Sequence, residues 1–134
     1  MTSDNHHPTE SDISHPLEHV LLIARTHAAT EVDAPPEKVS AGSGKALDWA
    51  TYSDPARGFH VGHWQAEPGI RAVHYTETEL CHLLEGRVRL SDASGAIEFG
   101  PGESFVISPG FTGTWESIGR VTKLYAILDP APAR

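Results

Sequence analysis

Short runs of strand-forming residues recur every eight to twelve residues from about Leu47 onward, and turn-forming residues bound each of them. The turns read SDPARG, EPG, SDASG, GPGE, SPGFTG and SIGR, whose Gly, Pro, Asp and Ser supply the φ values of tight turns. No window carries the apolar stripe of an amphipathic helix. Eight short strands in about 80 residues predict an all-β fold, a sandwich or a jelly roll barrel rather than an open sheet.

The strand pattern predicts one domain at residues 47–129, flanked by less regular segments. With 134 residues and 39% hydrophobic content, the chain can bury a core without disulfides or structural metals. Residues 1–15 are expected to form a disordered N-terminal arm, in which His6 and His7 are solvated side chains rather than metal ligands. Residues 16–46 are expected to pack on the barrel as an arm or strand followed by a linker, and residues 130–134 form a tail. The expected strands are Asp48 to Tyr52, Phe59 to Ala66, Ile70 to Tyr75, Glu79 to Ser91, Ala96 to Phe99, Ser104 to Ile107, Thr112 to Ser117 and Thr122 to Leu128.

Charge and hydropathy exclude several classes of partner. The formal net charge is -8 and no window collects basic residues into a stripe, so nucleic acid binding is not expected. The longest apolar run, VLLIA at Val20 to Ala24, is too short to span a bilayer, and it fits either a short strand or one or two turns of helix. The N-terminus lacks the features of a signal peptide, and Cys81 is alone, so we expect a cytoplasmic protein without an intrachain disulfide.

Strand alternation sorts the residues of the longest expected strand into two faces. Glu79, Cys81 and Leu83 share one face, whereas Leu80, His82 and Leu84 share the other. A late strand likewise aligns four residues on one face: Val121, Lys123, Tyr125 and Ile127. Both faces are rich in apolar residues, which predicts burial on both sides. One face would fill a barrel, and the other would lie under a second layer, an arm or another subunit. We therefore hypothesise a homodimer.

Two motifs of the sequence carry a resemblance to a known family. ELCHLLEG, in which six residues separate Glu79 from Gly86, is similar to the end of the first motif of the cupin superfamily, whose fold is the RmlC-like jelly roll, and GPGESFVISPGFTGTW, Gly100 to Trp115, is similar to the second. Together with GHWQAEPG and TKLYAI, these blocks resemble small single-domain cupins related to ureidoglycine aminohydrolase and the ethanolamine-utilization Q protein. The resemblance implies a jelly roll barrel with an N-terminal arm, whose open end holds a small molecule, often beside a metal, and members that are frequently dimeric.

The metal ligands that the resemblance implies are mostly missing. Counting back from Glu79, the histidine pair of the first motif falls on Val73 and Tyr75 in one register, or on Ala72 and His74 in the other. The histidine of the second motif falls on Thr114 or Gly113. A Glu77, Glu79 and Cys81 set could substitute, or Cys81 could pack as a small buried apolar residue. Since a tightly held transition metal usually needs three protein ligands, we predict neither a metal nor another cofactor.

A buried carboxylate needs a partner, and Lys123 is the candidate for Glu79. Lys123 lies in a strand that is otherwise nearly free of charge, which is unusual for a surface lysine. We predict that Glu79 and Lys123 meet inside the barrel as the catalytic pair, with the lysine replacing the charge of a metal. The alternative is that Lys123 extends to the barrel rim without a functional partner.

Aromatic and polar residues are expected to surround this pair as the ligand-binding wall. An aromatic wall suits a small polar metabolite that has one flat or apolar side. Three other histidines, at positions 60, 63 and 82, are interpreted as surface or interface residues. The expected ligand-binding residues are His74 as a pocket base, Tyr75, Glu77, Trp115 and Tyr125, with Trp64 and Phe111 as further wall candidates.

Three functions remain open on these grounds. The first is a metal-free cupin that binds a small molecule. The second is a cupin enzyme acting on a ureide- or amine-bearing metabolite, with Glu79 as acid/base or with an unusually held metal. The third is a structural or regulatory dimeric domain whose barrel is simply filled. The sequence has no nucleophile elbow, no Walker loop, no dinucleotide-binding glycine motif and no H-E-x-x-H motif.

Overall fold

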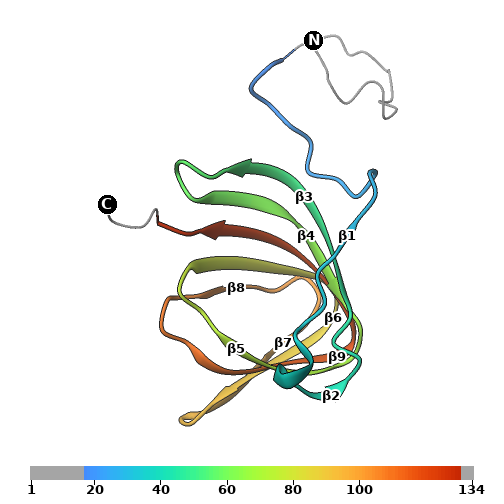
Figure 1. The fold of residues 1–134 in the computed structure, drawn as a ribbon, viewed down its shortest axis with the longest axis vertical. Coiled ribbons are helices and arrows are strands. Elements are labelled where there is room, and N and C mark those ends of the chain that lie inside the picture. The colour runs from blue at the N-terminus through green and yellow to red at the C-terminus, as the bar shows by residue number, and fades with distance from the viewer. Residues whose placement is uncertain (1–16, 131–134) are drawn as a thin grey trace.

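The computed structural model describes residues 17–130, which form one strongly curled β-sheet (Figure 1). The expected arm at residues 1–15, with His6 and His7, lies outside the described residues. Among those described there is no α-helix, and no helix could cross a membrane. The elements are β1 (Thr30–Glu31), the 3₁₀ turn η2 (Pro36–Lys38), β2 (Val39–Gly42), β3 (Ala46–Asp54), β4 (Phe59–Ala66), β5 (Gly69–His74), β6 (Thr78–Asp92), β7 (Gly95–Phe99), β8 (Ser104–Ile107) and β9 (Thr112–Leu128).

Two long antiparallel strands, β6 and β9, form the centre of the sheet. They pair with each other along most of their lengths. The first half of β9 also pairs with β5, and its second half pairs with β4, which in turn pairs with β3. On its other edge, β6 pairs with β8 and then with β7. Because β9 changes partner halfway, the sheet curls around an interior instead of staying open, as Figure 1 shows.

The change of partner occurs where glycines bend both long strands. Gly86 has φ +81° and Gly119 has φ +77°, and the register between β6 and β9 shifts on either side of Glu85. The prediction of a turn at SIGR, separating two strands at Ser117 and Thr122, was therefore wrong. Gly119 lies in a bulge within β9, and the chain does not reverse there. A glycine with positive φ fits a bulge as well as a turn, so the residue type alone did not distinguish the two.

The segment before β3 contains more regular structure than the sequence indicated. The stretch expected to be a connection includes η2 and β2, and β2 pairs with β5. The two-residue strand β1 pairs with β3. In contrast, residues 17–29 form neither a strand nor a helix. The apolar residues of this arm stay largely exposed, as Leu22 does at 57%.

The core lies on the inner face of the curled sheet, as strand alternation predicted. Cys81 and Leu83 of β6 are fully buried and join the core cluster with Trp115. The outer face differs from the expectation of burial on both sides. Leu80 and Leu84 are 47% and 43% exposed, because no second layer formed by residues 17–130 covers this face.

Candidate ligand cavity

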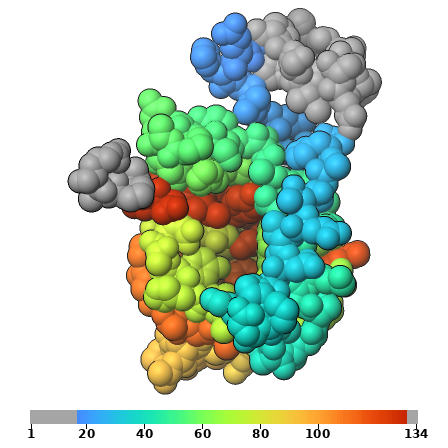
Figure 2. All heavy atoms as spheres, viewed as in Figure 1, coloured from blue at the N-terminus to red at the C-terminus, as the bar shows by residue number. Residues whose placement is uncertain are grey.

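The interior of the curled sheet opens into a cavity of about 380 Å³, and the face seen in Figure 2 is hollowed above it. The hollow lies between the blue-to-cyan segment that carries β1 and β2 and the yellow-green segment that joins β5 to β6. Atoms of β9, in red, lie at its bottom. The lining residues are Val32, Asp48, Trp64, Arg71, Val73, Tyr75, Glu79, Trp115, Lys123, Tyr125 and Ile127.

Strand register places the polar residues of the cavity beside one another. Asp48 of β3 is the cross-strand partner of Trp64 in β4, and Trp64 is the partner of Lys123 in β9. Directly opposed residues of antiparallel strands point to the same face. These three side chains therefore form one inward-facing row across the sheet. Glu79 reaches the row from the start of β6.

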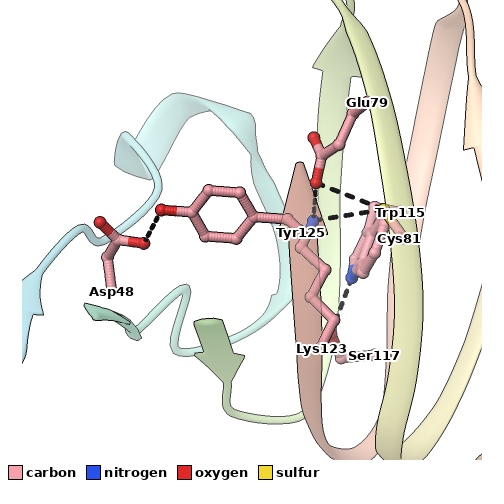
Figure 3. Close-up of polar contacts among 7 residues, drawn as sticks. All are labelled: Asp48, Glu79, Cys81, Trp115, Ser117, Lys123 and Tyr125. Carbon is pink, nitrogen blue, oxygen red and sulfur yellow. Dashed lines mark hydrogen bonds and ion pairs between the residues drawn. The ribbon is translucent and has the colours of Figure 1, made fainter. Parts of the chain in front are cut away.

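Glu79 and Lys123 form a buried ion pair, so their predicted contact is confirmed (Figure 3). Nζ of Lys123 lies 2.5 Å from Oε2 of Glu79, and the side chains are only 6% and 7% exposed. The alternative in which Lys123 extends to the barrel rim is wrong. The thiol of Cys81 donates to the same carboxylate oxygen over 3.3 Å and lies 3.7 Å from Nζ of Lys123. The assignment of the pair as catalytic residues stays a prediction.

Two indole rings enclose the ammonium group of Lys123. Its Nζ lies 4.7 Å from the ring centroid of Trp64 and 4.5 Å from that of Trp115, within the range of cation–π attraction. The two rings meet edge to face, with centroids 5.4 Å apart. Nε1 of Trp115 donates to Oγ of Ser117, which fixes the orientation of that indole. The rings therefore hold the cation in place while they shield it from solvent.

The surroundings keep Lys123 positively charged. Burial alone lowers the pKa of a lysine, but the electrostatic influence of its acidic neighbours, Cys81, Glu79 and Tyr75, together with the hydrogen bond to Glu79, acts in the opposite direction and prevails. The pKa of Lys123 is therefore raised above its usual value. Of these groups, the Glu79 carboxylate is the one in direct ion-pair contact. Lys123 is accordingly a fixed positive charge rather than a proton acceptor at neutral pH.

Cys81 is a protonated, unreactive thiol. Burial, the largest influence, raises the pKa of Cys81 to about 12 despite the opposing charge of Lys123. Only a thiolate is a strong nucleophile or metal ligand. Cys81 therefore packs as a small buried residue that donates a hydrogen bond, which is the second of the two interpretations considered for it.

Both predicted wall tyrosines line the cavity in protonated form. Burial raises the pKa of Tyr75, and burial together with the hydrogen bond to Asp48 raises the pKa of Tyr125. The hydroxyl of Tyr125 donates to Oδ1 of Asp48 over 2.7 Å (Figure 3). The backbone of Tyr75 exchanges hydrogen bonds with the turn at residues 110–111, which holds this residue at the end of β5.

Two predicted ligand-binding residues do not line the cavity. His74 is exposed at the end of β5, where its Nδ1 lies 2.6 Å from Oγ1 of Thr112. Val73 and Tyr75 point inward instead, so alternation turns His74 to the outer face and it cannot be a pocket base. Glu77 is half-buried in the segment between β5 and β6 and is also absent from the lining.

Two further interpretations of single residues were wrong. Phe111 packs against the hydrophobic core and lines a separate apolar groove beside β7 and β8 rather than the cavity. His63 is not a surface residue, since it is only 8% exposed, and within residues 17–130 its Nδ1 has no hydrogen-bond partner. Burial lowers the pKa of His63, and Arg25 of the arm adds to this effect. His60 and His82 keep partial exposure and approach serine hydroxyls.

The sequence interpretation missed two charged residues of the cavity, Arg71 and Asp48. Arg71 shares strand parity with Val73 and Tyr75, so alternation along β5 could have placed it inside. Asp48 had no comparable signal, because it stood at the start of an expected strand whose inward face was not assigned. Its position became apparent only from the register with Trp64.

The residues of the cavity do not fit a transition metal. The first-motif positions that face inward are Val73 and Tyr75, which offer no imidazole. The carboxylate of Glu79 is already occupied by the ammonium group of Lys123, and the thiol of Cys81 keeps its proton. Within residues 17–130, no three His, Cys, Asp or Glu side chains cluster as metal ligands. A carboxylate paired with lysine would have to lose that partner before it could coordinate a metal.

Comparison with known proteins supports the fold. A family model described as the EutQ-like cupin domain matches residues 53–125, which are 73 of the 134 residues. A protein of unknown function from Pseudomonas syringae pv. tomato shares 26% identity, with a TM-score of 0.70, over 80% of this chain. The match covers 47% of the Pseudomonas protein, so the chain spans about half of that protein's length.

Two ethanolamine-utilization proteins match in fold. The putative ethanolamine utilization protein Q of Salmonella typhimurium has a TM-score of 0.59 and 14% identity, over 78% of this chain and 96% of its own. The EutQ protein of Clostridium difficile has a TM-score of 0.58 and 11% identity, over 68% of this chain and 65% of its own. No curated protein matches the chain. The structural matches confirm the predicted jelly roll fold.

Proposed function

Because the chain belongs to the family of EutQ-like cupin domains, we propose that it binds a small organic molecule in the cavity beside the Glu79–Lys123 pair, without a metal. The observation that carries this proposal is a buried ion pair facing an open cavity of about 380 Å³ with aromatic walls. Ligand sites are typically concave, mostly apolar, and equipped with a few oriented polar groups. An open cavity also argues against a barrel that is simply filled, which was the structural or regulatory alternative.

The ion pair retains hydrogen-bonding capacity for a ligand. An ammonium group has three N–H donors, and Lys123 directs one to Glu79 and one weakly to Cys81, which leaves a third. Oε1 of Glu79 makes no hydrogen bond within residues 17–130. The fully buried side-chain polar atoms that lack a partner in these residues are Thr51 Oγ1 and His63 Nδ1. Oε1 of Glu79 also lacks a partner but does not belong to this set, so it is not fully buried. Oε1 is therefore accessible and can accept a hydrogen bond from a ligand.

A cavity-filling substitution tests the proposal. We expect thermal-shift screening of small polar metabolites to identify ligands that stabilise the wild-type protein. Val73→Trp should abolish that stabilisation, because Val73 lines the cavity. Ala72→Trp is the matched control, since Ala72 is the exposed neighbour on the opposite face of β5. Equal ligand-induced shifts for wild type and Val73→Trp would refute binding at this cavity.

A second candidate is an enzyme of acid–base type acting on a ureide- or amine-bearing metabolite. It is favoured by the accessible Oε1 of Glu79 beside the fixed charge of Lys123, an arrangement in which a carboxylate could move a proton while the ammonium stabilises negative charge. Glu79→Gln would then keep ligand-induced stabilisation but lose turnover. A ligand that binds the wild type and is recovered unchanged would favour the binding function instead.

A further inference from the structure

Arg71 places a cation without an ionic partner in the cavity wall. Its guanidinium lies 5.2 Å from the ring centroid of Trp64 and makes one long hydrogen bond, 3.5 Å, to the carbonyl oxygen of Gly44. Within residues 17–130, no carboxylate lies within ion-pair distance of it. Asp33 exerts an electrostatic influence on Arg71, but Oδ1 of Asp33 accepts a hydrogen bond from the backbone of Ala46. Most of the guanidinium donors are therefore available.

Asp48 places an anion without an ionic partner in the same cavity. Its Oδ1 accepts the hydroxyl hydrogen of Tyr125, a neutral donor, over 2.7 Å. Its Oδ2 makes no hydrogen bond in the part of the chain that the structure describes, nor does any cation there lie within 4 Å of either oxygen. A half-buried carboxylate gains from a charged donor, because such hydrogen bonds are about twice as strong as neutral ones.

Both free charges flank one indole, that of Trp64. Asp48 is its direct cross-strand neighbour, and Arg71 lies over its ring. The two groups do not reach each other, since they form no ion pair within 4 Å. Both line the same cavity as Trp64, so a ligand in that cavity can contact both charges and place an apolar part against the indole.

The charge balance of the cavity selects the kind of ligand. Its lining contains two cations, Arg71 and Lys123, and two anions, Asp48 and Glu79. Since Lys123 and Glu79 neutralise each other, one free charge of each sign remains. A ligand with a single charge would satisfy one of these groups and leave the other uncompensated beside it, which costs free energy in a partly buried site.

We propose that the cavity binds a small zwitterion of the amino-acid type, with its carboxylate on Arg71, its ammonium group on Asp48 and its apolar part over Trp64. This assignment rests on the proposed function, since it names the class of ligand for the same cavity. Arg71 and Asp48 are specificity-determining residues in this arrangement. The Glu79–Lys123 pair lies beside the ligand and orients its remaining polar groups.

Isothermal titration of the full chain with ω-amino acids, from glycine to 6-aminohexanoate, tests the assignment. Butyrate and n-butylamine are the singly charged controls. At least one ω-amino acid should bind about tenfold more tightly than either control, as expected for a second charge-assisted hydrogen bond. In Arg71→Gln, the ω-amino acid should bind no more tightly than n-butylamine. In Asp48→Asn, it should bind no more tightly than butyrate. Arg89→Gln, on an exposed arginine that pairs with Glu98, should leave both advantages unchanged.

Three results would overturn the assignment. One is that the wild type binds zwitterions and singly charged controls equally tightly. Another is that Arg71→Gln and Asp48→Asn, both with native circular dichroism, keep the wild-type preference for zwitterions. The third is that only neutral metabolites stabilise the wild type and that Val73→Trp abolishes this stabilisation. That result would leave the proposed function intact. If no small molecule stabilises the wild type at all, the proposed function fails together with the assignment. If Arg71→Gln does not fold, Arg71→Lys replaces it, and weakened zwitterion binding with unchanged n-butylamine binding is the supporting result.

Discussion

Lys123 is a buried cation that contacts an anion on one side and aromatic rings on the others. Its ammonium group is held by Glu79, Trp64 and Trp115, and the side chain is only 6% exposed. At this position the residue can provide the positive charge of the metal that the resemblance to cupins implied for this site. The carboxylate of Glu79 then orients an ammonium group rather than a metal ion.

Removing Lys123 should destabilise the protein strongly. Lys123→Met leaves Glu79 as a buried carboxylate without a cation, which costs about 3–5 kcal/mol of unfolding free energy. Urea unfolding at pH 7 measures this loss. The double variant Glu79→Gln/Lys123→Met removes both charges and should recover most of the stability. A Lys123→Met variant as stable as the wild type would show that the pair does not matter energetically.

Stability should decrease at alkaline pH. In the unfolded chain, Cys81 loses its proton near pH 9, whereas its pKa in the folded protein is about 12. The pKa values of Lys123, Tyr75 and Tyr125 are also raised on folding. Above about pH 9 the folded state therefore binds more protons than the unfolded state, so stability falls as pH rises, and below that pH these groups add no slope.

Urea midpoints measured from pH 7 to about pH 11 test this dependence. Cys81 alone should cost about 2 kcal/mol by about pH 10.5, at 1.36 kcal/mol for each pH unit above its unfolded pKa. Cys81→Ala should show a correspondingly shallower decrease. Midpoints that stay constant across this range would contradict the raised pKa values.

At the scale of elements, the curl of the sheet depends on the close approach of β6 and β9 at Gly86. A Cβ atom at Gly86 would lie 2.2 Å from the carbonyl oxygen of Arg120. Gly119, which has nearly the same positive φ, would place a Cβ in open space. The two glycines therefore separate the effect of backbone conformation from that of backbone contact.

Alanine substitutions at these two glycines should differ in cost. Gly119→Ala should lose about 1–2 kcal/mol of stability, which is the strain of a side chain at positive φ. Gly86→Ala should lose at least about twice that amount, because the clash with Arg120 adds to the strain. Chemical denaturation of both variants measures the difference. Equal losses would mean that the contact between the strands at Gly86 relaxes without cost.

Strand alternation predicted the inward face of the first half of β6 correctly, because Glu79, Cys81 and Leu83 are all buried while the residues between them are more exposed. The assignment of His74 failed because two registers of the motif were open, and a shift of one residue moves a side chain to the opposite face. Both β2 and β1 were missed because they are short, and their residues, VSAG and TE, show no strand-forming pattern. Their strand conformation comes from pairing with β5 and β3.

In the molecule as a whole, the part of the chain that the structure describes leaves an apolar area of the outer sheet face uncovered. Leu80 of β6 and Val106 of β8 are cross-strand partners and are 47% and 60% exposed, with Leu84 further along β6. Neighbouring apolar side chains exposed in this way are typical of an interaction surface. We propose that a second copy of the chain covers this face, as the apolar pattern on both faces of β6 suggested.

The dimer is tested by sedimentation velocity at micromolar concentration. Wild-type protein should sediment as a dimer, and Leu80→Glu should shift it to monomer, because a charge would be buried in the interface. Ile97→Glu is the control, since Ile97 is 56% exposed but is the partner of the inward-facing Leu90. A wild-type protein that is purely monomeric, or a dimer insensitive to Leu80→Glu, would contradict this interface.

We propose that Lys123 takes the place of a metal ion in the cavity. Elemental analysis tests it most directly, on protein produced without an affinity tag in medium supplemented with zinc, manganese, iron and nickel, and then dialysed. We expect metal far below one equivalent per chain, because the carboxylate of Glu79 is paired with Lys123 and no imidazole lines the cavity within residues 17–130. About one equivalent of a metal that resists dialysis, and that is lost in Glu79→Gln, would contradict the claim.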